Sequence, residues 1–542
     1  MQWLPSIATH ARSLDSFDRG FLWMVAAYVV GLLVLGAVLH PIPAVLAEND
    51  GYVGMAQQIQ RGELPRDPFR PMLYPLLSAA LGWIVGDCFT AAKIVSSVAA
   101  GLFVLTGGLL VRRCFGDRVA AWSALLTALN AHVILNGIQA STDMLASALS
   151  MLALWFAIRT ASDPRLLNLI GLGAACAMAY FTRYQTSLLM VPALLGTWVA
   201  PAAGVRTRIF RSLLVGTTVA VFLVPHFLLT HRSFGSILHD ESWRNVALKH
   251  YGNMDFSRLE ELPFDGMWSV LRYDPSGFVQ RGFAGVTWFA RWTGPELLRG
   301  GSPVARDTRD YTIVAPALDA SSSDGQIGIV LGVLVVVGVV TALWRAPSPF
   351  WIVFAYSALY IIFVCVAFAP WPRLLLVTLP PLYAAIVMPI ALVRGSKGEG
   401  LRCWIGGSAV LALIAGVVSQ TPESVNKFVN DHPFAEVAAA RELSNSNARP
   451  PRVVSTYSSM GEVVPGDFRF IHPPYAQSAA ASYLNRAVVE AVEQRAVFLL
   501  VGRVTMGVDR FEAIGEDMPA GTILIRRDGD VLLLRVLGVR KD

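Results

Sequence analysis

Residues 21–39 read FLWMVAAYVVGLLVLGAVL, a run of nineteen residues without a charged side chain. As a helix this run is about 29 Å long, which matches the roughly 30 Å hydrocarbon core of a bilayer. The run is long enough to span and lacks a small-residue cleavage site, so we expect a retained helix rather than a signal peptide. This stretch therefore predicts an integral membrane protein.

The composition of the whole chain agrees with that prediction. Of its 542 residues, 54% are hydrophobic and only 15% are charged, whereas soluble domains carry about 25% charged residues. We attribute the net charge of +6 to cytoplasmic Lys and Arg that set the topology, and expect no nucleic-acid partner. The five cysteines have neither paired nor metal-type spacing, which indicates neither disulfides nor zinc.

The apolar runs predict a polytopic α-helical membrane protein with about eleven transmembrane helices. With a cytoplasmic N-terminus, the inner loops contain twelve Lys and Arg, and the short outer loops contain two, Arg183 and Arg373. This asymmetry follows the positive-inside rule and places the long segments 40–89 and 231–325 outside. The predicted spans are residues 21–39, 90–111, 119–135, 144–158, 166–181, 187–200, 212–230, 326–344, 350–369, 374–393 and 403–419.

The remaining outer segment is the tail, residues 420–542, which we separate from a transmembrane domain at residues 1–419. Helical and strand patterns alternate in the tail, which predicts a small extracytoplasmic α/β domain. Short helices are also expected at 50–61 and 74–85. The predicted tail elements are helices at 434–443 and 485–494, strands at 452–457 and 496–501, and a hairpin of strands 522–526 and 531–536 around Asp528-Gly529-Asp530.

Acidic residues follow two of the outward helices. Glu48 and Asp50 lie in the AENDGY stretch directly after the first span, and Asp143 lies in STDM at the start of the fourth. A carboxylate at the membrane surface can act as a general base or hold a divalent cation. The alternative is helix capping, by Asp50 for the following short helix and by Thr142 or Asp143 for the fourth span.

Arginines are predicted on the same membrane face. Arg66 and Arg70 flank DPF in the first outer segment, while Arg183 and Arg373 lie in the short outer loops. The planar fork of arginine suits a phosphate group, because it donates two parallel hydrogen bonds. The alternative is anchoring at the lipid headgroups, with the aromatic side chains as an interfacial belt.

These motifs, in this order, resemble the integral-membrane glycosyltransferases of the GT-C fold, in particular the lipid-A aminoarabinose transferases and protein O-mannosyltransferases. The resemblance covers about the first 200 residues, and the later spans and the tail match in layout alone. Asn49 separates the two acids of the first loop, where family members often have adjacent acids. The stretches that carry the resemblance are ENDGY with MAQQIQRGELP, RPMLYPLLSAALGWIVGD, RRCFGDRVAAWSALL, STDMLASALSMLALW and AYFTRYQTSLLMVP.

The resemblance implies a protein of the bacterial inner membrane. It also implies inverting transfer of a sugar from a polyprenyl-phosphate donor to a glycan, lipid or protein acceptor. It implies that Asp50 is the catalytic base and that Glu48 and Asp143 are supporting acids, with the need for a divalent cation left open. Tyr74 and Tyr184 would line the sugar site. The residues that it implies for the donor phosphate are Arg66, Arg70, Arg183 and Arg373.

Other functions stay open at this point. A polymerase or ligase of the same fold, which moves a lipid-linked glycan, would use the same residues. A transporter would bury ionisable groups in the middle of its spans, where this chain has very few. A membrane-anchored binding module would place the function in the tail, which contains no recognisable catalytic motif.

Overall fold

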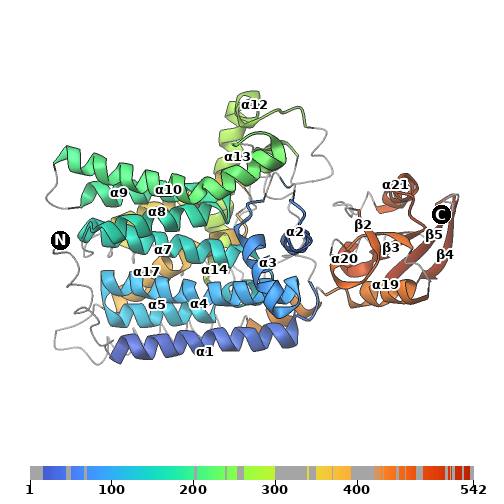
Figure 1. Ribbon diagram of the computed structural model, residues 1–542, viewed down its shortest axis with the longest axis horizontal. Coiled ribbons are helices and arrows are strands. Elements are labelled where there is room, and N and C mark those ends of the chain that lie inside the picture. Colours follow the sequence, from blue (N-terminus) through green and yellow to red (C-terminus); the bar gives the residue numbers. More distant parts are fainter. Residues whose placement is uncertain are drawn as a thin grey trace.

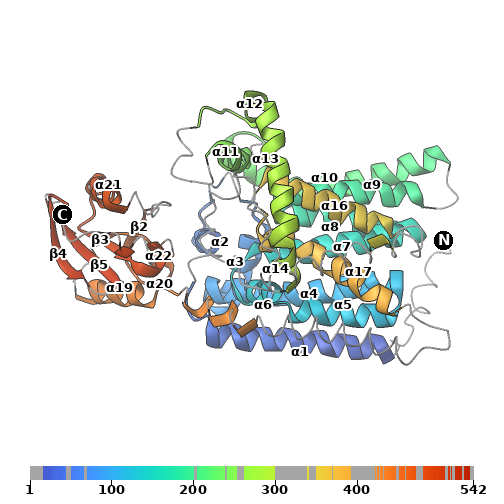
Figure 2. The same ribbon diagram turned by 180° about the vertical axis from the view of Figure 1, so that it is seen from behind.

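The structure is a computed structural model (Figures 1 and 2). Helices dominate it, and they form a bundle with the folded part of the tail beyond one end. The structure describes residues 16–43, 51–65, 67, 70–200, 204–237, 241–252, 262–299, 339–340, 350–368, 370–391, 421–422, 424–426, 428–430, 432–446, 451–457, 459–471, 480–506, 511–512, 514, 519–527 and 530–537.

The predicted spans that fall on described residues form helices. Within that part of the chain, four helices are long and apolar enough to cross a bilayer, and a fifth span results if α5 and α6, bent by 58°, count as one. The predicted spans 326–344, apart from residues 339–340, and 403–419 lie outside the described residues, so the count of eleven stays a prediction. The bundle consists of α1 (Ser16–Leu39), α4 (Cys88–Phe115), α5 (Asp117–Leu129), α6 (Ala131–Ile138), α7 (Thr142–Ser162), α8 (Leu166–Tyr180), α9 (Met190–Val199), α10 (Val205–Phe234), α16 (Trp351–Ala367) and α17 (Leu379–Ala391).

Small residues allow the helices of the bundle to pack closely. A Cβ at Gly101 of α4 would lie 2.3 Å from Val29 of α1, and one at Gly108 would lie 2.4 Å from Phe21. In lipid, helix association depends on such close packing because there is no hydrophobic driving force between apolar surfaces. Glycine at these positions therefore brings α1 against α4, the helix that also packs against α7.

The two outer segments add short helices at the end of the bundle that faces the tail (Figures 1 and 2). The predicted helices at 50–61 and 74–85 are confirmed as α2 (Tyr52–Gln60) and α3 (Leu73–Val85). The second outer segment contains α11 (Trp243–Tyr251), α12 (Met267–Tyr273), α13 (Pro275–Trp288) and α14 (Gly294–Arg299).

The tail contains a mixed five-stranded sheet with the order β2-β1-β3-β5-β4. Strands β2, β1 and β3 are parallel, while β5 pairs antiparallel with β3 and β4, so the predicted hairpin is confirmed. One face of the sheet packs on α21 (Ala480–Glu493) and the other on α19 (Phe434–Ser446). The strands are β1 (Arg452–Ser455), β2 (Asp467–Phe470), β3 (Phe498–Gly502), β4 (Thr522–Arg527) and β5 (Val531–Val536), and the short helices are α20 (Met460–Val463) and α22 (Arg503–Met506).

Candidate functional site

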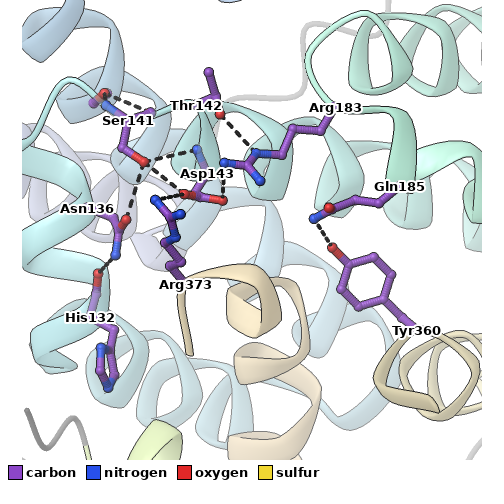
Figure 3. A network of polar contacts seen from close by, with 10 residues as sticks. His132, Asn136, Ser141, Thr142, Asp143, Arg183, Gln185, Tyr360 and Arg373 are labelled. Atoms are coloured by element: carbon purple, nitrogen blue, oxygen red, sulfur yellow. Dashed lines mark hydrogen bonds and ion pairs between the residues drawn. The ribbon is translucent and has the colours of Figure 1, made fainter. Parts of the chain in front are cut away.

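A buried carboxylate at the start of α7 is the centre of a polar network (Figure 3). Asp143 is only 2% exposed, and its Oδ1 lies 2.9 Å from Nη2 of Arg183. Its other oxygen, Oδ2, lies 4.0 Å from Nη1 of Arg373. One acid therefore sits between two arginines that come from sequence positions 190 residues apart, and the three side chains together carry a charge of about +1 at neutral pH.

The two arginines lie between the acid and the surface. Their side chains are 14% and 23% exposed, whereas the side chain of Asp143 is 2% exposed. Arg183 is also directed by Thr142, whose Oγ1 accepts a hydrogen bond from its Nε at 2.9 Å. Arg373 lies over the ring of Trp371 at 5.3 Å. Each guanidinium group is thus oriented by a neighbouring side chain and is more exposed than the carboxylate of Asp143.

The start of α7 is fixed by Ser141 rather than by the residues that the sequence suggested as caps. The Oγ of Ser141 accepts a hydrogen bond from the backbone N–H of Asp143 at 3.2 Å, which makes Ser141 the N-cap. The prediction that Thr142 or Asp143 caps the helix is therefore wrong, because both side chains are occupied by Arg183. Asp143 lies in the first helical turn, where the helix dipole favours its negative charge.

Tyr74 is connected to the start of α7 by hydrogen bonds. Its ring is fully buried, and its hydroxyl donates to the backbone oxygen of Ala92 and is hydrogen-bonded with Oγ of Ser96, both at 2.9 Å. Oγ of Ser96, which donates to the Tyr74 hydroxyl, accepts a hydrogen bond from the backbone N–H of Ser141 at 3.3 Å. This chain of hydrogen bonds connects α3 with α4 and with the residue that caps α7.

The first outer segment is joined to the arginine loop by its backbone. The N–H of Leu73 donates to the oxygen of Phe181 at 3.0 Å, two residues before Arg183. Three residues before Leu73, Arg70 forms an ion pair with Asp67 and lies 6.0 Å from the centre of the Tyr52 ring. The structure thus brings the segment that contains Arg70 next to the end of α8.

Tyr184 belongs to an aromatic group at the same end of the bundle. Its ring centre lies 5.3 Å from that of Tyr180 and 5.8 Å from that of His226, which is buried in α10. The next residue, Gln185, donates to the hydroxyl of Tyr360 on α16 at 2.9 Å (Figure 3). Sequence analysis did not identify Tyr360, because no local motif marks it and the contact spans 175 residues.

Three of the predicted site residues, Glu48, Asp50 and Arg66, lie outside the described residues. Among the described residues, no group of three or more His, Cys, Asp and Glu side chains could hold a metal ion. That finding does not include the two acids of the first loop. Asp143 itself is a poor metal ligand in this arrangement, since Oδ1 is paired with Arg183 and Oδ2 accepts a hydrogen bond from Ser141 with Arg373 nearby.

A buried lysine in the second outer segment binds the last carbonyl groups of α16. Lys249 is 1% exposed, and its Nζ donates to the backbone oxygens of Cys365 and Val366, the latter at 3.1 Å. Burial lowers its pKa to about 8, and burial also lowers the pKa of the neighbouring His250 to about 4. A cation is stabilised near the C-terminus of a helix, where the dipole is negative. Lys249 of α11 thus stabilises the C-terminal end of α16, which precedes Arg373.

A family model matches part of the chain. Residues 69–229, less than a third of the chain, match the family model described as dolichyl-phosphate-mannose-protein mannosyltransferase. This range includes Arg70, Tyr74, Asp143, Arg183 and Tyr184. No curated protein matches the chain in a sequence search.

Solved structures match over nearly the whole chain. The crystal structure of ArnT from Cupriavidus metallidurans bound to undecaprenyl phosphate has 11% identity and a TM-score of 0.54, and the match covers 96% of this chain and 99% of that one. Its apo form matches with a TM-score of 0.57. The oligosaccharyltransferase of Archaeoglobus fulgidus, in complex with zinc and sulfate, has 13% identity and a TM-score of 0.53, with coverage of 89% and 68%. The expected architecture is thereby confirmed, and the chain is an integral membrane protein with the GT-C glycosyltransferase fold.

Proposed function

We propose that this protein transfers a sugar from a polyprenyl-phosphate donor to an acceptor hydroxyl at the outer face of a bacterial inner membrane. The observation that carries the proposal is the pair of oriented arginines around buried Asp143 at the tail end of the bundle. An excess of one positive charge at this depth suits the phosphate of a membrane-embedded lipid. The likeness in fold to an ArnT structure bound to undecaprenyl phosphate supports this donor class.

The reaction requires a base and a site for the leaving phosphate. Asp50 takes the proton of the acceptor hydroxyl, whose oxygen attacks the anomeric carbon from the face opposite the phosphate. The bond between that carbon and the phosphate oxygen breaks, so the configuration inverts and the polyprenyl phosphate leaves with one additional negative charge. Arg183 and Arg373 stabilise that charge as it develops.

The other predicted residues have supporting roles in this proposal. Asp143 orients Arg183 through Oδ1, while its Oδ2 accepts a hydrogen bond from Oγ of Ser141 at 3.0 Å and lies 4.0 Å from Arg373. Arg66 and Arg70 extend the positive surface toward the phosphate, and Glu48 positions the acceptor or a divalent cation. Tyr184 lines the sugar site. Tyr74 supports the start of α7 through Ser96.

Binding of undecaprenyl phosphate to the purified full chain tests the phosphate site separately from chemistry. Arg373→Ala should raise the Kd for undecaprenyl phosphate by roughly tenfold or more, because a hydrogen bond to a charged group contributes about 1.5–3 kcal/mol. The matched control is Arg272→Ala, since Arg272 likewise lies over a tryptophan, Trp268, at 5.0 Å. Undecaprenol, which lacks the phosphate, should bind equally to all forms.

Transfer is then measured with undecaprenyl-phosphate sugars as donors. Asp50→Asn should abolish transfer while expression and the Kd for undecaprenyl phosphate stay at the wild-type level. Retained transfer in this variant would exclude Asp50 as the base. A wild-type Kd for undecaprenyl phosphate in Arg373→Ala would exclude the proposed phosphate site.

A further inference from the structure

The tail contains an open cavity that is lined by polar side chains. It lies between the amino ends of β1 and β2 and the end of α21, and its volume is about 610 Å³. This volume is in the range of small-molecule sites, although most such sites are lined by apolar side chains. A polar lining suits a hydrophilic, charged ligand instead. The lining residues are Arg452, Arg469, Glu493, Gln494 and Arg495.

Asp467 lies between two of the three arginines. Its Oδ2 lies 2.5 Å from Nε of Arg452, and its Oδ1 lies 3.3 Å from Nε of Arg469. Nη1 of Arg452 also donates to the backbone oxygen of Gln494 at 2.9 Å, just beyond the end of α21. The three arginines, Asp467 and Glu493 together carry a charge of about +1 at neutral pH. The cavity therefore favours an anion.

The third arginine has an unusual backbone conformation. Arg495 has a φ of 54°, and it is the one residue other than glycine with a positive φ in the described part of the chain. It follows α21 at a position where glycine is common: its N–H donates to the oxygen of Val492, and the N–H of Ala496 donates to that of Ala491. A residue with a Cβ is disfavoured in this left-handed conformation.

The side chain of Arg495 does not repay this unfavourable conformation by contacts of its own. It is exposed, and among the described residues its guanidinium group forms no hydrogen bond or ion pair. Glycine would make the same turn at a lower free energy. Backbone strain of this kind is often found at functional sites, and a ligand in the cavity would account for the arginine.

The tail contacts the end of α1 at the opposite end of its strands. Nδ1 of His40, directly after α1, lies 2.8 Å from Nε2 of His432, and the hydroxyl of Tyr457 donates to the backbone oxygen of Pro43. Tyr457 follows the carboxyl end of β1, whereas Arg452 begins that strand. A strand of this length rises about 13 Å. The cavity thus lies away from the contact that joins the tail to the first outer segment.

We propose that this cavity binds the phosphate group of a soluble phosphorylated saccharide. Arg469 and Arg495 donate to the phosphate oxygens through their planar forks. The carboxylate of Glu493 accepts hydrogen bonds from the sugar hydroxyls. A lipid headgroup has the same phosphate chemistry, but the position of the cavity, away from the end of α1, favours a soluble ligand. The inference goes beyond the proposed transfer, because this site does not use the residues around Asp143.

Binding of glucose 6-phosphate to the purified full chain, measured by calorimetry, tests the inference. Wild type should bind this probe saturably and more tightly than inorganic phosphate, while glucose should not bind. No saturable binding of glucose 6-phosphate below about 10 mM would overturn the inference. Arg373→Ala should bind the probe as wild type does. A weaker affinity in Arg373→Ala would place the probe at the proposed donor site and overturn the inference as well.

Arg495→Gly separates binding from stability. The Kd for glucose 6-phosphate should rise at least roughly tenfold, because a hydrogen bond to a charged group is lost. The Tm should stay the same or rise, because glycine suits the left-handed conformation. The matched control is Arg441→Ala, which removes an exposed arginine from α19 on the other face of the sheet. A Kd for Arg495→Gly equal to that of Arg441→Ala would overturn the inference.

Nanodiscs distinguish a soluble ligand from a lipid headgroup. The ratio of the Kd values of Arg495→Gly and wild type for glucose 6-phosphate should be the same in phosphatidylcholine and phosphatidylglycerol nanodiscs. If phosphatidylglycerol weakens binding of the probe to wild type and not to Arg495→Gly, the headgroup is the ligand and the inference of a soluble saccharide fails. None of these measurements requires sugar transfer, so their outcome is independent of the proposed function.

Discussion

Glu436, at the start of α19, should make the stability of the protein depend on pH. The side chain is 1% exposed, and burial raises its pKa from 4.5 to about 7. One oxygen accepts hydrogen bonds from the backbone and hydroxyl of Thr505 at 3.4 Å. The other oxygen has no partner among the described residues. The folded protein therefore retains a proton on this carboxyl at pH values where the unfolded chain has lost it.

The sign and size of the effect follow from that difference in proton binding. Between about pH 4.5 and 7 the folded state binds more protons than the unfolded state, so stability falls as the pH rises through this window. At 1.36 kcal/mol per pH unit, the full effect above pH 7 is about 3 kcal/mol. Glu436→Gln keeps an acceptor for Thr505 and removes the titration, so the variant should lose this pH dependence.

The assay is thermal unfolding of the detergent-solubilised full chain between pH 4.5 and 8.5. The apparent Tm of Glu436→Gln, relative to wild type, should rise with pH and reach a plateau above about pH 7. The matched control is Glu442→Gln on the same helix, because the side chain of Glu442 is 77% exposed, and its curve should follow wild type. A Tm difference between Glu436→Gln and wild type that stays constant over the whole pH range would refute the reasoning.

Three further predictions concern the bundle and the second outer segment. Asp143→Asn leaves two guanidinium groups without their carboxylate and should lower the free energy of unfolding by about 3–5 kcal/mol. Undecaprenyl phosphate should then raise the Tm of the variant more than the Tm of wild type, and an equal rise would contradict the prediction. Wild type should gain stability as the pH rises from about 8 to 10.5, because the buried amine of Lys249 binds its proton less tightly than it does in the unfolded chain. Lys249→Met should remove this gain. A Tm difference between the variant and wild type that is the same at pH 7.5 and pH 9.5 would exclude the prediction. Gly285→Ala places a Cβ 2.2 Å from the backbone oxygen of Cys365 and should lower the Tm by several degrees. Gly282→Ala, whose new Cβ would have its nearest contact at 3.3 Å, should change the Tm little. Equal Tm values for the two variants would contradict this packing.

Local patterns predicted much of the architecture. The strand predicted at 496–501 is found at Phe498–Gly502, and the hairpin strands agree within one residue, because alternation and a turn signal are both local. The positive-inside rule placed Asp143, Arg183 and Arg373 on one face, and their ion pairs confirm that they lie together.

Contacts between distant parts of the chain could not be predicted in this way. The sequence suggested a role in phosphate binding for Arg183, yet the partners that orient it, Thr142 and Asp143, are about 40 residues away and leave no periodic signal. The contact of His40 with His432 joins residues 392 positions apart. The exact cap of α7 also depended on side-chain geometry, since serine, threonine and aspartate are all good caps.

The contact between residues 40–43 and the tail has a consequence for the order in which the protein is assembled. His40 and Pro43 are synthesised early, whereas His432 and Tyr457 emerge about 390 and 410 residues later. At a synthesis rate of about 5–20 residues per second, some 20 to 80 seconds separate the two halves of this contact. The bundle can therefore assemble before the tail reaches residues 40–43, so this contact is among the last that the growing chain makes.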